Sequence, residues 1–222
     1  MAKAVIFDVD GTLIDSNDLH VGAWVETFRH FGHEVAAEAV RPHIGKGGDQ
    51  LMPEFLPAEM IEERGEEITA FRTSLFLREY MPRAEPFPAV RSLLARLREA
   101  GQRIALASSS KPEELERSIE ITGIADLIDT TTSSADAEHS KPSPDIFRAA
   151  LERLAPLQAA DAVVVGDTPY DAEAAGKLGL RTIGLLCGGF PETWLRDAGC
   201  IAIYRDAAHL LAEFEASALA GP

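Results

Sequence analysis

Cysteine is scarce in this chain of 222 residues, and long apolar runs are absent. Cys187 and Cys200 are the only cysteines, which provides no disulfide framework and fits a reducing cytoplasm. No apolar run is long enough to span a bilayer. The first predicted strand begins at residue 4, so we also expect no signal peptide. Together these features predict a cytoplasmic protein that is not embedded in a membrane.

Basic residues are also few compared with acidic ones. Lys and Arg total 21 against 36 Asp and Glu, which gives a formal net charge of -15. Such a chain should attract neither nucleic acid nor an anionic membrane surface. An anionic substrate would need local cations or a metal ion to offset this field. The hydrophobic content of 46% is typical of a globular protein with a sizeable core.

The first informative stretch is the apolar run at residues 4–7, which stops at Asp8-Val9-Asp10-Gly11-Thr12. An apolar run bounded by a turn predicts a buried strand of a parallel sheet, and sites lie beyond the carboxyl ends of such strands. Asp8 and Asp10 are two residues apart, so an extended backbone puts both on one side, where their charges repel. We expect a cation between them; the alternative is a strand end with ordinary turn aspartates.

The remaining pattern predicts two kinds of organisation. Apolar residues recur at helical spacing in four segments, 16–31, 35–40, 51–55 and 58–80, and a proline-rich linker follows at 81–88. From residue 90 helices alternate with strands expected at 103–107, 127–130, 162–165, 181–185 and 200–203. This alternation predicts an α/β fold, a doubly wound parallel sheet with helices on both faces. Residues 1–15 and 87–222 would form this core domain, and residues 16–86 an inserted all-helical cap domain.

Polar residues follow several of the predicted strands. Ser108 follows the strand at 103–107, and Gly166-Asp167-Thr168-Pro169-Tyr170-Asp171 follows the strand at 162–165. Lys141 stands just before a proline and a predicted helix. A doubly wound topology brings strand ends to one edge of the sheet. That edge would hold the carboxylates of Asp8, Asp10, Asp167 and Asp171, the Ser108 hydroxyl and the Lys141 ammonium.

These motifs resemble those of the haloacid dehalogenase superfamily of hydrolases, which have a Rossmann-like core and, here, a helical cap inserted after the first strand. The matching parts are DVDGT at 8–12, Ser108 after an apolar strand, Lys141 in SKP, and GDTPYD at 166–171. All four occur in order and span nearly the whole chain. The phosphatase and β-phosphoglucomutase branch is the most similar, because its cap begins with a stretch like 20–24.

The resemblance implies magnesium-dependent hydrolysis of a small phosphorylated metabolite, phosphoglycolate-like or a sugar phosphate, by a monomer. Asp8 would be the nucleophile that forms an aspartyl-phosphate, and Asp10 the general acid and base. These two roles need different protonation states, so the environments should push the two pKa values apart. Asp8, the Asp10 backbone carbonyl and Asp167 would bind Mg²⁺, with Asp171 near the metal. Ser108 and Lys141 would hold the transferring phosphoryl oxygens.

Two other functions are compatible with the same motifs. A β-phosphoglucomutase-type phosphotransferase would form the same intermediate on Asp8, and the stretch 20–24 favours it. Thr12 favours hydrolysis, because the mutase pattern usually has valine after this glycine. A non-catalytic sensor that kept the fold is disfavoured by the intact motifs.

Several single residues have two interpretations. Ser109 is the alternative to Ser108 as the phosphoryl ligand. Ser110 begins a Ser-x-x-Glu pattern, which predicts a helix capping box instead of a catalytic role. Thr12 either orients the nucleophile or fills the turn. Asp171, three residues after Thr168, also fits a helix cap.

Substrate selection is expected in the cap. Gly45-Lys46-Gly47 precedes a helix and could receive an anion through its backbone N–H groups and the Lys46 ammonium. The alternative is a plain turn between two helices. His20 could reach the site from the start of the cap, although a lone histidine on a helix is more often structural.

Overall fold

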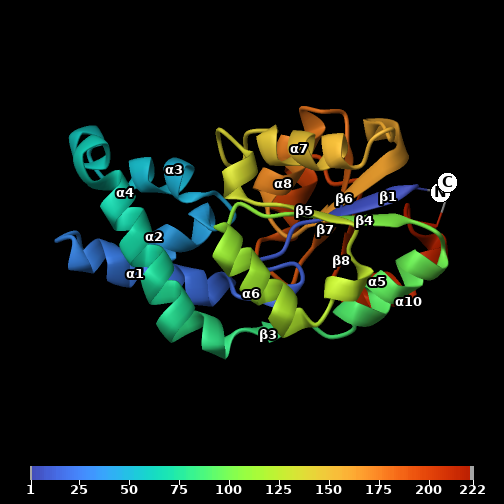
Figure 1. The fold of residues 1–222 in the computed structure, drawn as a ribbon, viewed down its shortest axis with the longest axis horizontal. Helices are drawn as coiled ribbons and strands as arrows, with labels where there is room; N and C mark the ends of the chain where they lie inside the picture. The colour runs from blue at the N-terminus through green and yellow to red at the C-terminus, as the bar shows by residue number, and fades with distance from the viewer. Residues whose placement is uncertain (1, 221–222) are drawn as a thin grey trace.

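A six-stranded parallel sheet forms the centre of the computed structural model, which describes residues 2–220 (Figure 1). The strand order is β5-β4-β1-β6-β7-β8. The strands are β1 (Ala4–Phe7), β4 (Arg103–Ala107), β5 (Thr130–Thr132), β6 (Ala162–Gly166), β7 (Arg181–Leu185) and β8 (Ala202–Tyr204). The first strand therefore lies in the middle of the sheet, with Phe7 opposite Leu106 of β4 and Val165 of β6.

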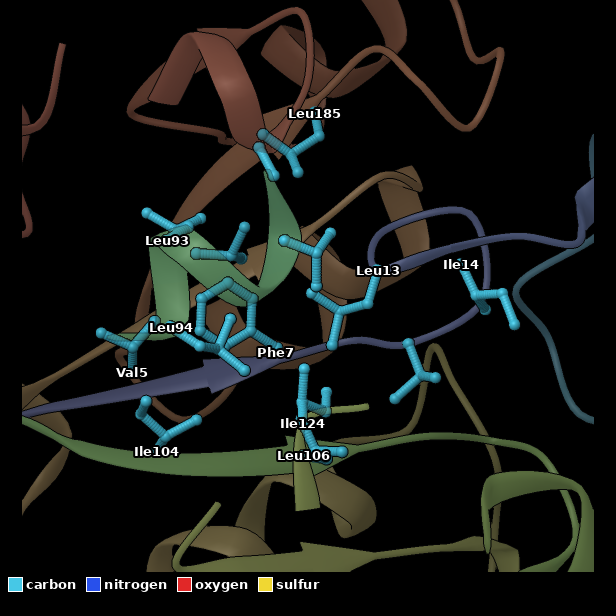
Figure 2. Close-up of a cluster of buried hydrophobic side chains, with 14 of the residues drawn as sticks. Val5, Phe7, Leu13, Ile14, Leu93, Leu94, Ile104, Leu106, Ile124 and Leu185 are labelled. Carbon is cyan, nitrogen blue, oxygen red and sulfur yellow. The ribbon is translucent and has the colours of Figure 1, made fainter. Parts of the chain in front are cut away.

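Helices cover both faces of this sheet, because successive side chains of each strand point to opposite faces. One face is covered by α5 (Val90–Glu99), α6 (Pro112–Thr122) and α10 (Ala207–Ala212), the other by α7 (Asp145–Arg153) and α8 (Pro169–Gly176). Helix α9 (Glu192–Asp197) follows β7. A cluster of buried apolar side chains fills the space between the sheet and α5, α6 and α10. Figure 2 shows Phe7 at the centre of this cluster, surrounded by side chains from α5 and the neighbouring strands. The predicted fold class is confirmed.

The helical segment between the first strand and α5 gathers at one end of the molecule (Figure 1). It contains α1 (Asn17–His30), α2 (Ala37–Val40), α3 (Gly48–Leu51) and α4 (Ala58–Leu75), a π-helical turn at Phe76–Tyr80, and 3-10 turns at Arg41–His43, Met52–Glu54 and Met81–Arg83. Its own apolar cluster includes Trp24, Phe28 and Ile68. We call residues 17–83 the helical segment below. Its status as a separate domain with the boundaries given above stays a prediction.

A short antiparallel ribbon joins the helical segment to the sheet. Strand β2 (Ile14–Asp15) pairs with β3 (Glu85–Pro86), so the chain enters and leaves the helical segment at adjacent positions. The sequence predicted only a linker at 81–88, because a two-residue strand is too short to show an alternating pattern. Among residues 2–220, no helix is both long and apolar enough to cross a membrane.

The predicted elements differ from the observed ones mainly at their ends. Strands β4 and β7 have the predicted bounds. Strand β5 starts at Thr130, because residues 125–127 form a 3-10 turn first. Helix α8 starts at Pro169, three residues before the predicted start at Ala172, because Thr168 and Asp171 form a reciprocal capping box. Short 3-10 turns also occur at Ser134–Asp136, Ala159–Asp161 and Phe214–Ala216.

Replacing Leu97 with alanine is expected to lower the free energy of unfolding by about 2–5 kcal/mol, because the change removes a buried branched side chain and leaves a cavity. Leu97 is fully buried in the cluster beneath α5. Glu99→Ala, an exposed position of the same helix, is the control and should stay within about 0.5 kcal/mol of the parent protein. Denaturant titration measures both; equal losses would contradict this placement of α5.

Candidate active site

The predicted strand ends meet at one edge of the sheet. Strands β4, β1 and β6 are neighbours, so Ser108, Asp8 and Asp167 follow directly after three adjacent strands. The Asp8 N–H still donates to the Val165 carbonyl at 2.9 Å, and the Ser108 N–H to the Thr132 carbonyl at 3.0 Å. These bonds extend the sheet by one residue and fix the backbone from which the side chains project.

Lys141 lies between two of the carboxylates. Its Nζ is 2.5 Å from Asp8 Oδ1 and 2.7 Å from Asp171 Oδ1, although its side chain is only 1% exposed. Burial by itself would lower the pKa of Lys141, but the charges of Asp171 and Asp8 outweigh it and raise that pKa above its usual value. The ammonium is therefore held in its charged form beside Asp8.

Asp8, Asp167 and Asp171 form a buried carboxylate cluster. One oxygen from each residue lies within 4.8 Å of the others. Asp167 Oδ1 accepts a hydrogen bond from the Thr12 hydroxyl at 2.8 Å, and Asp167 Oδ2 accepts one from the Asn17 amide at 2.8 Å. Burial, followed by the charges of Asp8 and Asp171, raises the pKa of Asp167 well above its usual value. The Lys141 ammonium alone does not balance three carboxylates, so the cluster is short of positive charge.

This cluster fits a magnesium ion. Its donors are all oxygens, and carboxylate oxygens are the ligands that Mg²⁺ prefers in proteins. The excess of negative charge supplies the electrostatic demand for a divalent cation. Asp8, Asp167 and Asp171 are three of the four predicted metal residues. Asp10, the fourth, was predicted to contribute its backbone carbonyl; its carboxylate points into a different environment.

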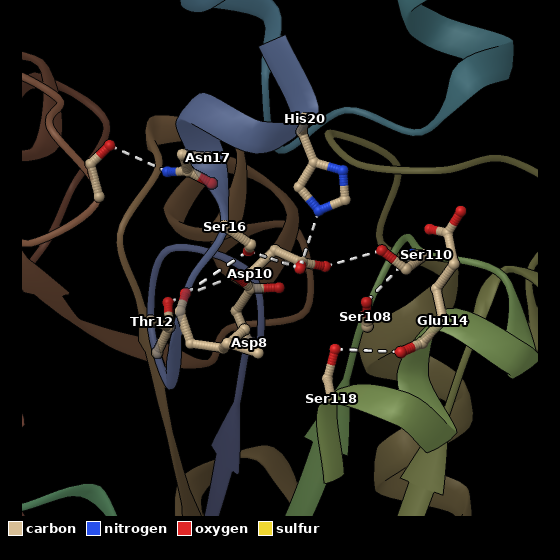
Figure 3. Close-up of polar contacts among 12 residues, drawn as sticks. Asp8, Asp10, Thr12, Ser16, Asn17, His20, Ser108, Ser110, Glu114 and Ser118 are labelled. Atoms are coloured by element: carbon tan, nitrogen blue, oxygen red, sulfur yellow. Dashed lines mark hydrogen bonds and ion pairs between the residues drawn. The ribbon is translucent and has the colours of Figure 1, made fainter. Parts of the chain in front are cut away.

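The Asp10 carboxylate is surrounded by hydrogen-bond donors. Asp10 Oδ1 accepts from the Ser16 hydroxyl at 2.7 Å and from His20 Nε2 at 2.9 Å, and Asp10 Oδ2 accepts from the Ser110 hydroxyl at 2.7 Å (Figure 3). Burial alone would raise the pKa of Asp10, but His20 and these hydrogen bonds outweigh it and hold the pKa below its usual range. Asp10 is thus held ionised, in the form that accepts a proton.

The pKa values of the two aspartates are pushed apart, but in the direction opposite to the predicted roles. Burial, with Asp171 and Asp10 adding to it against the charge of Lys141, raises the pKa of Asp8 to about 7. A nucleophile must be ionised, and a general acid must carry a proton. A cation bound at the cluster would favour the ionised form of Asp8 that a nucleophile needs.

His20 is oriented from three sides. Arg72 Nη2 contacts His20 Nδ1, and a guanidinium can only donate, so His20 Nε2 carries the proton that is donated to Asp10. The His20 ring also stacks on Phe76 with centroids 4.0 Å apart. Arg72 in turn forms an ion pair with Glu114 of α6 at 2.5 Å. His20 is therefore a part of the site and not an isolated structural histidine.

Ser110 corrects one of the sequence predictions. The predicted capping box with Glu113 is wrong: α6 begins at Pro112, Lys111 is its N-cap, and no side chain caps it. The Ser110 hydroxyl donates to Asp10 instead, and its N–H donates to Ser108 Oγ at 3.0 Å. Ser109 Oγ is buried without a hydrogen-bond partner within residues 2–220. Which of Ser108 and Ser109 contacts a phosphoryl group stays a prediction.

Thr12 and Asp171 each make contacts that fit both of the roles considered for them. The Thr12 hydroxyl donates to Asp167 and also lies 3.3 Å from Asp8 Oδ2, so it positions carboxylates as well as forming the turn. Asp171 Oδ2 accepts from the Thr168 hydroxyl at 2.8 Å as the cap of α8, while Asp171 Oδ1 faces Lys141. One carboxylate therefore fixes a helix start and a site cation together.

A cavity of about 1320 Å³ opens between this edge of the sheet and the helical segment. Asp8, Asp10, His20 and Ser109 line it, as does the loop Gly45-Lys46-Gly47. This loop packs tightly against the core, because a Cβ on Gly47 would lie 2.0 Å from Ser140 Oγ and one on Gly45 2.6 Å from Thr168 Cγ2. The predicted site residues thus lie in the cluster, in its hydrogen bonds or in the wall of the cavity, except Ser108, which follows β4 and accepts the Ser110 N–H.

Lys46 has partners other than a ligand. Its Nζ donates to Glu54 Oε1 at 2.8 Å, lies 3.0 Å from His43 Nδ1, and stands 5.1 Å from the centre of the Tyr170 ring. Asp49 follows the glycines, and its carboxylate accepts the Ser140 N–H at 3.0 Å. In the predicted anion-binding loop, the Lys46 ammonium is therefore already paired with Glu54, and the Asp49 carboxylate lies close by in the chain.

Comparison with known proteins agrees with this architecture. Residues 5–185 match the family model described as haloacid dehalogenase-like hydrolase. The chain belongs to this family. It is 30% identical over 203 residues to a putative pyrophosphatase PpaX of Caldanaerobacter subterraneus, covering 87% of this chain and 86% of that one.

Two further relatives extend over most of the chain. A phosphoglycolate phosphatase of Rhodospirillum rubrum is 30% identical over 219 residues, which covers 95% of this chain and 90% of that protein. A crystal structure of a hydrolase from Pseudomonas syringae superposes with a TM-score of 0.90 at 25% identity, covering 97% and 99% of the two chains. This haloacid dehalogenase-like chain therefore resembles these two proteins over nearly all of its length.

Several residues of the site escaped sequence reasoning. Ser16 was predicted only as the N-cap of a helix, Arg72 only as a possible counterpart of the cap lysine of a mutase, and Asn17 and Glu114 were given no role. Asn17 and Asp167 are 150 positions apart, and Arg72 and Glu114 are 42 apart. Their pairing depends on how the helical segment lies over the sheet, for which local spacing in one sequence carries no signal.

Gly188→Ala is expected to lower the free energy of unfolding by about 1–3 kcal/mol, because an added methyl group overpacks a full site. Its Cβ would lie 1.7 Å from Asp167 Oδ2, so Asp167 would have to leave Thr12 and Asn17. Gly176→Ala in α8, where a Cβ meets nothing within 4 Å, is the control and should be neutral or slightly stabilising. Thermal unfolding compares the two; an unaffected Gly188→Ala variant would contradict the geometry.

Proposed function

We propose that this chain is a magnesium-dependent phosphatase that hydrolyses a small phosphate monoester through an aspartyl-phosphate on Asp8. The observation that carries the proposal is the different setting of two aspartates at the end of one strand. Asp8 is buried beside Lys141 within the carboxylate cluster, whereas Asp10 is held by three donors at the cavity wall. The names of the relatives from Caldanaerobacter and Rhodospirillum, both enzymes that act on phosphates, support the same chemistry.

In the first half-reaction an Asp8 oxygen attacks phosphorus and the bond to the ester oxygen breaks. This step requires Asp10 to take up a proton first, because the hydrogen bonds described above favour its ionised form; the departing oxygen then takes that proton. The Ser16 and Ser110 hydroxyls can accept as well as donate, so they can turn to stabilise either protonation state of Asp10. Lys141 offsets charge on the transferred group.

In the second half-reaction Asp10 takes a proton from water, and the oxygen of this water attacks the phosphorus of the aspartyl-phosphate. The Asp8 carboxylate and inorganic phosphate are released, and Asp10 regains its proton. A bound magnesium ion, held by Asp8, the Asp10 carbonyl, Asp167 and Asp171, would offset the repulsion between carboxylates and phosphate. The side chain of His20 holds Asp10 in place through both steps.

Asp8→Asn should reduce kcat by several orders of magnitude with the fold retained, because the amide cannot act as the nucleophile. The measurement is release of inorganic phosphate from a panel of phosphate monoesters. Asp15→Asn, an exposed aspartate close by in the chain, is the matched control and should keep its turnover. Substantial activity in Asp8→Asn would rule out the covalent intermediate.

Removal of divalent metal with a chelator should abolish turnover, and added magnesium should restore it, since the cluster lacks balancing charge. Asp167→Ala should weaken magnesium binding more than Asp171→Ala does in calorimetric titration. Asp171→Ala should cost more stability, because it also removes the cap of α8 and a partner of Lys141. Full activity in excess chelator would refute the metal requirement.

One assay separates hydrolysis from the phosphoglucomutase alternative, which shares the intermediate on Asp8. The enzyme is given β-glucose 1-phosphate with a trace of the 1,6-bisphosphate, and both products are followed. We expect inorganic phosphate to accumulate faster than glucose 6-phosphate. The reverse ranking would replace the phosphatase proposal with a phosphotransferase.

A further inference from the structure

The charges around the cavity bear on the chemistry of the leaving group. The helical segment contributes three cationic side chains to the cavity wall, and each already forms an ion pair with a carboxylate. The pairs are Lys46–Glu54 at 2.8 Å, Arg72–Glu114 at 2.5 Å and Arg78–Glu79 at 2.7 Å. A second anionic group on a substrate would have to displace one of these carboxylates before it could bind any of these three cations.

Further carboxylates line the same wall. They are Asp49, Glu66, Glu113 and Glu138, in addition to the catalytic aspartates. Lys111, the N-cap of α6, is an exposed cation of the cavity without an ion pair among residues 2–220, and it precedes Glu113 and Glu114 in the chain. The rest of the wall is mainly neutral or apolar and includes Trp24, Met52, Thr69, Thr73 and Leu77. Like charges in partly screened surroundings repel strongly enough to decide between ligands of equal shape.

We propose that the leaving group of the substrate is uncharged, so that the substrate is the monophosphate of a neutral sugar or polyol and carries neither a carboxylate nor a second phosphate. This inference rests on the proposed phosphatase function and narrows it. The reacting phosphate meets Lys141 and the metal-binding cluster at the sheet. The remainder of the substrate faces the three paired cations, the four further carboxylates and Lys111.

Glu114 is the residue that enforces this selection. Its side chain is 1% exposed and that of Arg72 is 9% exposed, so the pair is shielded from salt and solvent. Arg72 is also the cavity cation that lies against His20, next to Asp10 and hence to the departing oxygen. Without the Glu114 charge, its guanidinium would be the natural partner for an anionic leaving group.

The test compares substrates that differ in charge and not in size. The pairs are 2-phosphoglycolate against its amide, and 6-phosphogluconate against sorbitol 6-phosphate, which is also an open chain. In the parent enzyme kcat/KM should be at least about tenfold higher for the neutral member of each pair, the size of one unfavourable charge contact in a partly screened site. An equal or higher value for the anionic members would overturn the inference.

The second part of the test asks whether a substitution changes the ratio of kcat/KM between the anionic and the neutral substrate of a pair. Glu114→Gln should raise the anionic-to-neutral ratio of kcat/KM by at least about tenfold, mainly through KM for the anionic member, because it releases Arg72. Adding Arg72→Met to Glu114→Gln should abolish that gain. Glu192→Gln, which breaks an exposed ion pair with Arg196 away from the cavity, should leave the ratio unchanged. An unchanged ratio in a folded Glu114→Gln variant would also overturn the inference.

Two further controls separate the possible failures. Turnover of p-nitrophenyl phosphate with magnesium reports on the phosphatase chemistry alone. If the enzyme turns over neither this compound nor any other phosphate monoester, the proposed function is wrong, and the narrower inference is wrong with it. Turnover that favours anionic substrates overturns only the inference. If Lys111→Gln selectively reduces turnover of 2-phosphoglycolate, Lys111 is an anion-binding group and the inference is wrong. If Glu114→Gln does not fold, the substrate pairs on the parent enzyme still decide.

Discussion

Mutual repulsion among the carboxylates at the carboxyl edge of the sheet is the constraint on which the rest of the site depends. Asp8, Asp167 and Asp171 are brought within contact distance by adjacent elements, with Lys141 as their neutralising partner. Neighbouring groups accommodate this arrangement: Thr12 and Asn17 donate to Asp167, and the capping box of α8 satisfies Asp171. The free energy of core burial must hold the cluster together, because its own charges oppose it.

Asp10 shows how two chemically identical side chains acquire different properties two positions apart. Asp8 faces other carboxylates and an ammonium, while Asp10 faces hydroxyls and an imidazole from α1 and the loop after β4. Because Ser16 directly precedes the helical segment and His20 belongs to it, the proton affinity of Asp10 depends on where that segment lies. Arg72 and Glu114 tie the same segment to α6. In the proposed mechanism, proton transfer by Asp10 and enclosure of the substrate would therefore depend on one set of contacts.

Much of this arrangement could be predicted from the sequence, because most of the informative patterns lie within a few neighbouring residues. The apolar runs at β4 and β7 determine their own bounds, and the motifs carrying Asp8, Asp10, Lys141, Asp167 and Asp171 are local. Ser110 was misassigned because a local capping pattern matched it, whereas its partner Asp10 is 100 positions away. The ion pair between Lys46 and Glu54 could not be predicted for a related reason. It forms only because the turn at Met52–Glu54 brings Glu54 back to Lys46.

The ribbon of β2 and β3 gives the molecule a modular construction. Because the chain crosses to the helical segment and returns through two adjacent strands, the points of departure and return are neighbours on the surface of the sheet domain. An insertion anchored in this way can be lengthened, shortened or exchanged without any change in strand order. Selection could then alter the wall of the cavity through the insert, provided that the contact of His20 with Asp10 is kept, while Asp8, Lys141 and Asp167 stay at the edge of the sheet.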